Sequence, residues 1–114
     1  MVTKLIISTQ VLHILLSVAL GEKHGYEIMK DVIKSSEGQI KLGPGTLYGA
    51  LKRLLFNNLI VEIDKKETDY SEKRRYYKLT ESGRILLSSE LDQLNRTLER
   101  AKSLKLLKNN FQYE

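Results

Sequence analysis

The side chains best suited to binding an anion lie in two short stretches in the middle of the chain. The first, residues 44–58, holds Lys52 and Arg53 and no acidic residue. The second is the run KRRYYK at residues 73–78, in which cations are interleaved with tyrosines. Lysine and arginine bind phosphate oxygens, and arginine does so with two parallel hydrogen bonds. A nucleic acid is therefore the first candidate partner, although either stretch alone is also typical of a solvated surface.

The net charge of the chain is concentrated in the same region. Of the total of +5 over 114 residues, residues 41–78 contribute +4, from nine basic and five acidic side chains. Residues 1–40 are neutral overall and residues 79–114 contribute +1. A basic patch confined to one structural unit is the electrostatic footprint of a nucleic-acid-binding domain. It would also attract an acidic protein, so a protein-interaction module is the alternative function.

The sequence gives no support for catalysis or metal binding. It contains no cysteine, and its two histidines, His13 and His24, fall on different predicted elements with no cluster of acids beside them. No phosphate-binding loop, nucleophile elbow or catalytic triad is recognisable. The apolar stretch Leu5–Leu20 is shorter than the roughly 20 residues that span a membrane. We therefore expect a cytoplasmic protein with no enzymatic activity, no catalytic residues, no metal and no cofactor.

The periodicity of the apolar residues predicts the elements that position these side chains. The period changes from helical to two after residue 58 and becomes helical again after Thr80, a favourable N-cap followed by an acid. Between the two strands lies a charged segment, residues 65–73. The predicted elements are helices over residues 4–20, 25–35 and 44–57, strands over residues 59–64 and 74–79, and a long helix from residue 81 to about residue 108.

The third helix has a core face and a solvent face. Leucines recur at helical spacing on the core face, at Leu47, Leu51 and Leu54. The opposite side then carries Thr46, Gly49, Lys52 and Arg53. A recognition helix places its N-terminal residues at the base edges of the major groove. Thr46 and Tyr48 are therefore candidates for contacts with bases or phosphates, and Lys52 and Arg53 for contacts with phosphates.

The two strands are expected to form a ribbon with one face on the core. In the first strand Val61 and Ile63 are predicted to point inward, and in the second Tyr77 is predicted to pack rather than to contact a ligand. Arg75 would then point to the same side as Tyr77. The better exposed cations of this strand are expected to be Lys73 and Arg74.

Three helices followed by a two-stranded ribbon form a winged helix-turn-helix. The expected fold class is therefore mostly α (α+β), a winged helix-turn-helix with an additional long C-terminal helix. We expect residues 1–80 to form the DNA-binding domain, residues 81–108 a dimerisation helix and residues 109–114 a flexible tail.

The last helix carries a heptad pattern of apolar residues. Spacings of four and three separate Leu87, Leu91, Leu94, Leu98 and Ala101. Such a stripe would be exposed on a lone helix and is best explained by a partner surface, so we expect a homodimer. The alternative is that these leucines pack on their own domain.

Several motifs together resemble the PadR family of transcriptional regulators. They are HGYEI at residues 24–28, GPGTLY at 43–48, LKRL at 51–54, and RRYYKLT at 74–80 followed by Gly83. The similarity covers roughly residues 10–84, and the single last helix resembles the short branch of the family. The resemblance implies a winged-helix repressor, dimeric through its terminal helices, that binds inverted-repeat operators in double-stranded DNA.

The resemblance also implies which residues meet DNA and what regulates binding. It assigns DNA contact to Thr46, Tyr48, Lys52, Arg53, Lys73, Arg74 and Arg75. Some short members bind flat apolar ligands between their long helices, which implies a small apolar or aromatic effector as an optional partner. The positions expected to line such a site in this chain are aliphatic leucines, and the chain has no tryptophan.

Overall fold

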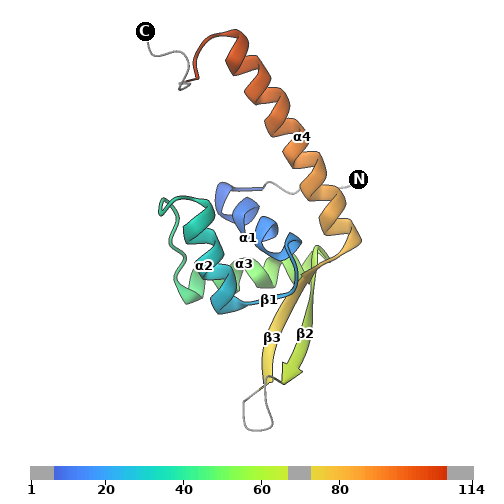
Figure 1. The fold of residues 1–114 in the computed structure, drawn as a ribbon. Helices are drawn as coiled ribbons and strands as arrows, with labels where there is room; N and C mark the ends of the chain where they lie inside the picture. The colour runs from blue at the N-terminus through green and yellow to red at the C-terminus, as the bar shows by residue number, and fades with distance from the viewer. Residues whose placement is uncertain (1–6, 67–72, 108–114) are drawn as a thin grey trace.

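The computed structural model describes residues 7–66 and 73–107, and its architecture is a winged helix with a long C-terminal helix (Figure 1). Helices α1 to α3 form the body, a ribbon of two strands projects from one side of it, and α4 projects from the other. The predicted fold class is confirmed. The elements in chain order are α1 (Thr9–Ala19), β1 (Lys23–His24), α2 (Gly25–Ser35), α3 (Pro44–Phe56), β2 (Ile60–Lys66), β3 (Lys73–Leu79) and α4 (Glu81–Ser103).

Helix α1 begins later than its apolar pattern predicts. Residues 7 and 8 are not helical, because Ser8 has an extended backbone and its Oγ accepts a hydrogen bond from the Val11 N–H at 3.1 Å. This serine is an N-cap that the apolar pattern obscured. Residues 4–6 of the predicted helix lie outside the described part of the chain.

An ion-pair network ties α1, β1 and α2 together. The Asp31 carboxylate accepts hydrogen bonds from Ser17 Oγ and from Lys23 Nζ, both at 2.7 Å. Burial raises the pKa of Asp31, and the two hydrogen bonds with the nearby lysine charge outweigh it, so the pKa lies below its usual 3.8. The network fixes the turn from which α2 starts.

Helix α3 forms as its sequence predicts. Pro44 occupies the first turn, where a missing N–H costs little. The predicted core leucines are all buried: Leu47, Leu51 and Leu54. The helix ends at Phe56 with Asn57 as its C-cap, and Asn58 takes a left-handed conformation with φ of 59°.

The sheet corrects the predicted inward face of the first strand. The strand order is β1-β3-β2, all antiparallel, with Ile60 opposite Leu79 and Glu62 opposite Tyr77. Ile60 is 2% exposed, whereas Val61 is 41% exposed on the other face, so the prediction that Val61 points inward was wrong. Ile63 shares that other face and is only half-buried. The ribbon leaves the body soon after Ile60, so apolar residues further along have no core to enter.

Helix α4 is anchored at its first turn and ends earlier than predicted. The Thr80 side chain accepts a hydrogen bond from the Gly83 N–H at 2.9 Å and donates one to the Asn58 carbonyl at 2.6 Å. The helix ends at Ser103, because Lys105 takes a φ of 58° and the Leu106 N–H bonds back to the Ala101 carbonyl. The predicted tail, residues 109–114, lies outside the described residues.

Within residues 7–66 and 73–107, no helix is long and apolar enough to cross a membrane.

Candidate nucleic-acid interface

The solvent face of α3 presents cations and small residues without competing acids. Thr46, Lys52 and Arg53 are exposed, as predicted. In the described part of the chain neither cation forms an ion pair. Gly43 caps the helix without a side-chain hydrogen bond, and a Cβ at Gly43 or Gly45 would have no atom within 4 Å. A backbone or a phosphate can therefore approach the start of α3 closely, at the positive end of the helix dipole.

Tyr48 is held between α3 and the start of α2. Its side chain is about half exposed, at 49%. A Cβ added to Gly25 would lie 2.3 Å from the Tyr48 hydroxyl oxygen and 2.9 Å from Cζ. The absence of a side chain at Gly25 is therefore what lets the tyrosine ring lie against α2.

The two arginines of β3 are both exposed, although Arg75 was expected to be less exposed than Arg74. Arg75 shares the strand face of Tyr77, yet its side chain is 72% exposed, because the ribbon has already left the body at this point. Its Nε lies 3.5 Å from a Glu62 oxygen, a weak solvated pair. Arg74 Nη1 lies 3.1 Å from His24 Nε2. Lys73 stands opposite Lys66 at the far end of the ribbon, and its side chain lies outside the described part.

Tyr77 packs in the core, as predicted. It is 2% exposed. Burial raises its pKa to about 12, and the Glu62 carboxylate, which accepts a hydrogen bond from the hydroxyl, adds to the shift. The phenol is therefore neutral at ordinary pH, and its ring packs between the ribbon and the body.

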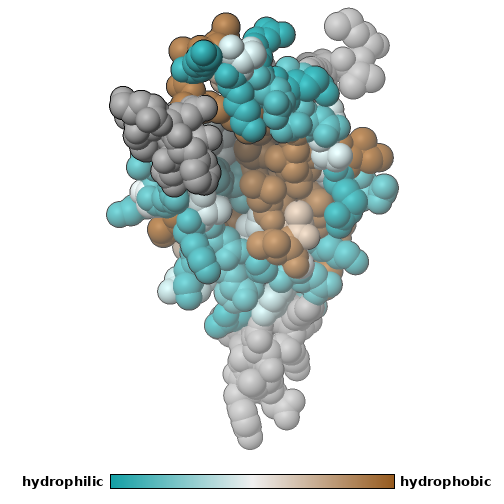
Figure 2. Space-filling view, turned by 45° about the horizontal axis from the view of Figure 1, so that its top comes forward, coloured by the Kyte–Doolittle hydropathy of each residue, from teal (hydrophilic) through white to brown (hydrophobic). Residues whose placement is uncertain are grey.

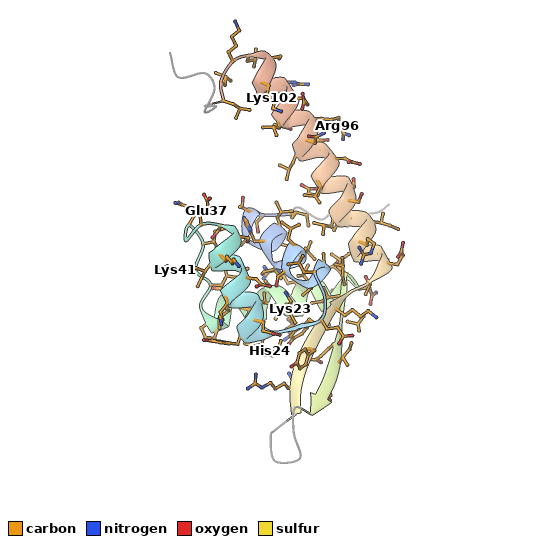
Figure 3. All side chains as sticks on the ribbon, in the orientation of Figure 1. Lys23, His24, Glu37, Lys41, Arg96 and Lys102 are labelled. Carbon is orange, nitrogen blue, oxygen red and sulfur yellow. The ribbon has the colours of Figure 1, made fainter. Side chains whose placement is uncertain are left out.

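A hollow of about 500 Å³ opens where α2, α3 and β3 meet. It is lined by His24, Gly25, Tyr26, Tyr48, Arg74 and Arg75. Figure 3 shows His24 at the turn into α2, beside the ribbon. The sequence alone does not bring residues 24–26 to this site, because His24 and Arg74 are 50 residues apart and only the pairing of β1 with β3 brings them together. That two-residue strand carried no pattern of its own.

The described residues contain no group of three or more metal-ligating side chains. His13 Nδ1 instead lies 2.6 Å from Ser35 Oγ, where it links α1 to α2. His24 caps α2, accepting a hydrogen bond from the Glu27 N–H.

The apolar face of α4 divides into two parts. Leu87 is 5% exposed and belongs to the hydrophobic core of the winged helix. The residues that we call the leucine stripe, Leu91, Leu94 and Leu98, are 39%, 44% and 41% exposed. Ala101, one turn beyond, is half-buried. Figure 2, with the α4 side turned toward the viewer, shows hydrophobic side chains gathered at the centre of this face and hydrophilic ones around them.

Comparison with known proteins identifies the family. Residues 11–89 match the transcriptional regulator PadR-like family. The chain belongs to this family. PadR-like proteins are transcriptional regulators and not enzymes, so the candidate interface is a binding surface rather than an active site.

Solved structures and one curated protein are similar to this PadR-like chain. A transcriptional regulator from Clostridium thermocellum has a TM-score of 0.67 at 28% identity, covering 85% of this chain and 91% of that one. A PadR family regulator from Clostridium difficile has a TM-score of 0.67 at 27% identity, covering 82% and 96%.

Two further relatives differ in length from this chain. Bacillus subtilis PadR, solved in complex with operator DNA, is 24% identical with a TM-score of 0.62 and shows the shared fold, covering 70% of this chain and 45% of that one. An uncharacterized 37.1 kDa protein in transposon TN4556 of Streptomyces fradiae is 37% identical over 83 residues. This stretch is 73% of the present chain but only 22% of the Streptomyces protein.

Proposed function

We propose that this PadR-like protein binds specific sites in double-stranded DNA and represses transcription as a homodimer on an inverted repeat. The observation that carries the proposal is the exposed, acid-free face of α3, with Lys52 and Arg53 outside any ion pair of the described residues. The B. subtilis relative with the same fold was solved on operator DNA. The proposal places the protein in the cytoplasm, together with the DNA that it regulates.

The chemistry of the side chains indicates which residues would contact phosphates and which would contact bases. Lysines and arginines neutralise phosphates and set the orientation of the protein, while the start of the recognition helix reads base edges. Thr46 would contact a base edge or a thymine methyl. Lys52 and Arg53, nearly two turns further along α3, would contact phosphates, and Lys73, Arg74 and Arg75 would extend the contact along the ribbon.

The proposed dimer forms through α4. Water-exposed leucines at positions 91, 94 and 98 would be covered by a second copy, and Ala101 would extend the contact. Leu87 contributes only indirectly, since it serves its own core. A two-fold dimer reads two half-sites about 34 Å apart, one turn of DNA. A small apolar or aromatic effector would bind between the two α4 helices, and aromatic dyes and phenolic acids that alter DNA affinity would support that part of the proposal.

The direct test is a fluorescence-anisotropy titration with the promoter duplex upstream of the protein's own gene. A random duplex of equal length is the comparison. Neutralising six to ten phosphates makes affinity fall by about 10³ to 10⁵ between 50 and 200 mM salt. Lys52→Ala/Arg53→Ala removes four cations per dimer and should lower the slope of log K against log salt by up to about 3.6.

The matched control is Arg96→Ala/Lys102→Ala, which removes the same charge from α4, far from α3 (Figure 3). It should keep both the promoter preference and the slope, with the dimer checked by sedimentation. Equal weak binding of wild type to both duplexes would refute specific recognition. Binding to neither would leave the protein-interaction module as the function.

A further inference from the structure

Helix α2 is capped by a histidine, which is not among the residues preferred at this position. Serine, threonine, aspartate and asparagine are the preferred N-caps, and none of them changes its charge near neutral pH. Here His24 Nδ1 accepts a hydrogen bond from the Glu27 N–H at 3.3 Å, and the Glu27 carboxylate accepts one from the His24 N–H at 3.0 Å. The cap of α2 therefore depends on an imidazole lone pair, which a single proton removes.

The same imidazole ring also faces the ribbon (Figure 3). Arg74 Nη1 lies 3.1 Å from His24 Nε2, and the Tyr76 ring meets the imidazole edge-on, with 5.3 Å between the ring centres. A neutral imidazole has one lone pair and one N–H. It offers the lone pair to the Glu27 N–H through Nδ1 or, in the other tautomer, to Arg74 through Nε2. A neutral ring thus has an acceptor for α2 or for the ribbon, and a protonated ring has an acceptor for neither.

Burial makes the loss of this acceptor costly. The His24 side chain is 13% exposed, and its hydrogen bond with the Glu27 N–H is partly buried. The backbone of His24 is held in β1 by its pairing with Tyr76 of β3. The ring can turn about its own bonds, but the residue cannot leave its place. A proton on Nδ1 therefore sets two N–H donors against each other in a site that water enters poorly.

The charged groups around the ring set the direction of its response. From β3, the Arg74 guanidinium repels a charged imidazole, and Arg75 lines the same hollow. From α2, Glu27 Oε1 lies 3.5 Å from Nε2 and attracts a charged imidazole. Lys30 Nζ lies 5.4 Å from the centre of the Tyr26 ring, which itself stacks on the imidazole. The tyrosines near the ring stay neutral in acid: Tyr26, Tyr48 and Tyr76.

We propose that His24 is a pH-sensitive latch between α2 and the ribbon. The neutral ring caps α2 and lies against Arg74. The protonated ring gives up the cap, pairs with the Glu27 carboxylate and drives the Arg74 side chain away. Acidification thus loosens the packing between α2 and β3. The latch is a property of the free protein and does not depend on the proposed DNA binding.

The test follows the Glu27 amide by NMR at about pH 7.5 and about pH 5.5, on either side of the range in which imidazoles titrate. In wild type, the protection of this amide from hydrogen exchange, corrected for the intrinsic rate at each pH, should fall roughly five-fold on acidification, which is the effect of one lost N-cap. His24→Asn keeps a strong cap that takes up no proton, so its amide should be equally protected at both pH values. In His24→Ala the amide should be equally unprotected at both.

The matched control is the second of the two histidines in the chain, His13. Its Nδ1 lies 2.6 Å from Ser35 Oγ, at the far end of α2. His13→Asn should leave the pH response of the Glu27 amide unchanged. Arg74→Gln should move this response to a higher pH, because it removes a repelling cation. Glu27→Gln, which keeps the capping box, should move it to a lower pH.

Three results would overturn the latch. They are equal protection of the wild-type Glu27 amide at both pH values, a fall of the same size in His24→Asn, and a response that disappears in His13→Asn. None of them bears on the proposed function, because no DNA is present in the experiment.

Discussion

Replacing Gly83 by alanine should test how closely the start of α4 packs against the winged helix. A Cβ at Gly83 would lie 2.1 Å from the Leu59 carbonyl oxygen, 3.0 Å from its carbonyl carbon and 2.8 Å from Leu79 Cδ1. The oxygen cannot retreat freely, because it accepts a hydrogen bond from the Thr80 N–H at 3.0 Å. The clash is therefore with backbone that joins the start of β2 to the end of β3.

The size of the effect follows from two opposing terms. Overpacking costs about 1–3 kcal/mol, and a backbone obstacle places this site at the upper end. Alanine favours the helix over glycine by about 0.8–1 kcal/mol. The net loss should be about 2 kcal/mol, which lowers the melting temperature by roughly 10 °C for a domain of this size.

Urea unfolding monitored by circular dichroism, at one protein concentration, measures this change. Gly49→Ala is the matched control, a glycine inside α3 whose nearest atom to a new Cβ is Arg53 Nη1 at 4.0 Å. It should gain about 0.5–1 kcal/mol. A Gly83→Ala protein within 0.5 kcal/mol of wild type would refute the close packing of α4 against β2.

Three further changes test other parts of the molecule. Burial is the largest single influence on the pKa of Asp31 and raises it, but the hydrogen bonds from Lys23 and Ser17 and the nearby lysine charges together hold this pKa below its usual 3.8. The charged form of Asp31 therefore stabilises the fold at a pH above 3.8. Asp31→Asn should therefore be less stable than wild type at pH 6 by urea unfolding, with a difference that narrows as the pH falls below 3.8. Burial raises the pKa of Tyr77 to about 12, so its stabilisation is present below pH 10 and is lost between pH 10 and about 12. Tyr77→Phe should lack that alkaline loss, and equal losses in both proteins would contradict the assignment. Leu94→Glu/Leu98→Glu should sediment as a folded monomer, and a dimer would exclude the leucine stripe as the interface.

Periodicity and capping rules predicted most of the fold. The leucines of α3 repeat every three or four residues with Pro44 before them and Asn58 after them, so the core face and both ends of the helix follow from local chemistry. The period change after residue 58 likewise predicted the ribbon. The inward face of β2 was wrong because alternation alone gives two choices, and the tertiary fact that the ribbon leaves the body after Ile60 decides between them.

The candidate interface was only partly predictable. Lys52 and Arg53 follow from the face opposite the core leucines of their own helix. The contact of His24 with Arg74 depends on β1, whose two residues pair with Tyr76 and Tyr77, more than 50 residues further along the chain. No window of the sequence contains that information. The burial of Leu87 was equally unpredictable. Leu87 has the heptad spacing of the leucine stripe, but the first turns of α4 pack against the winged helix and bury it in the core.

The mounting of α4 connects the proposed dimer to the proposed DNA contacts. Strand β3 carries Arg74 and Arg75 and runs directly through Thr80 into α4, which carries the leucine stripe. The connection between β3 and α4 is held by the Thr80 hydrogen bonds to the Asn58 and Leu59 carbonyls. It also depends on the absence of a side chain at Gly83, which lets α4 pack directly on Leu59. A change in the tilt of α4 must therefore move the ribbon or break this connection. In a two-fold dimer built on α4, the separation of the two recognition helices is thus set by backbone packing at Gly83 rather than by a flexible linker.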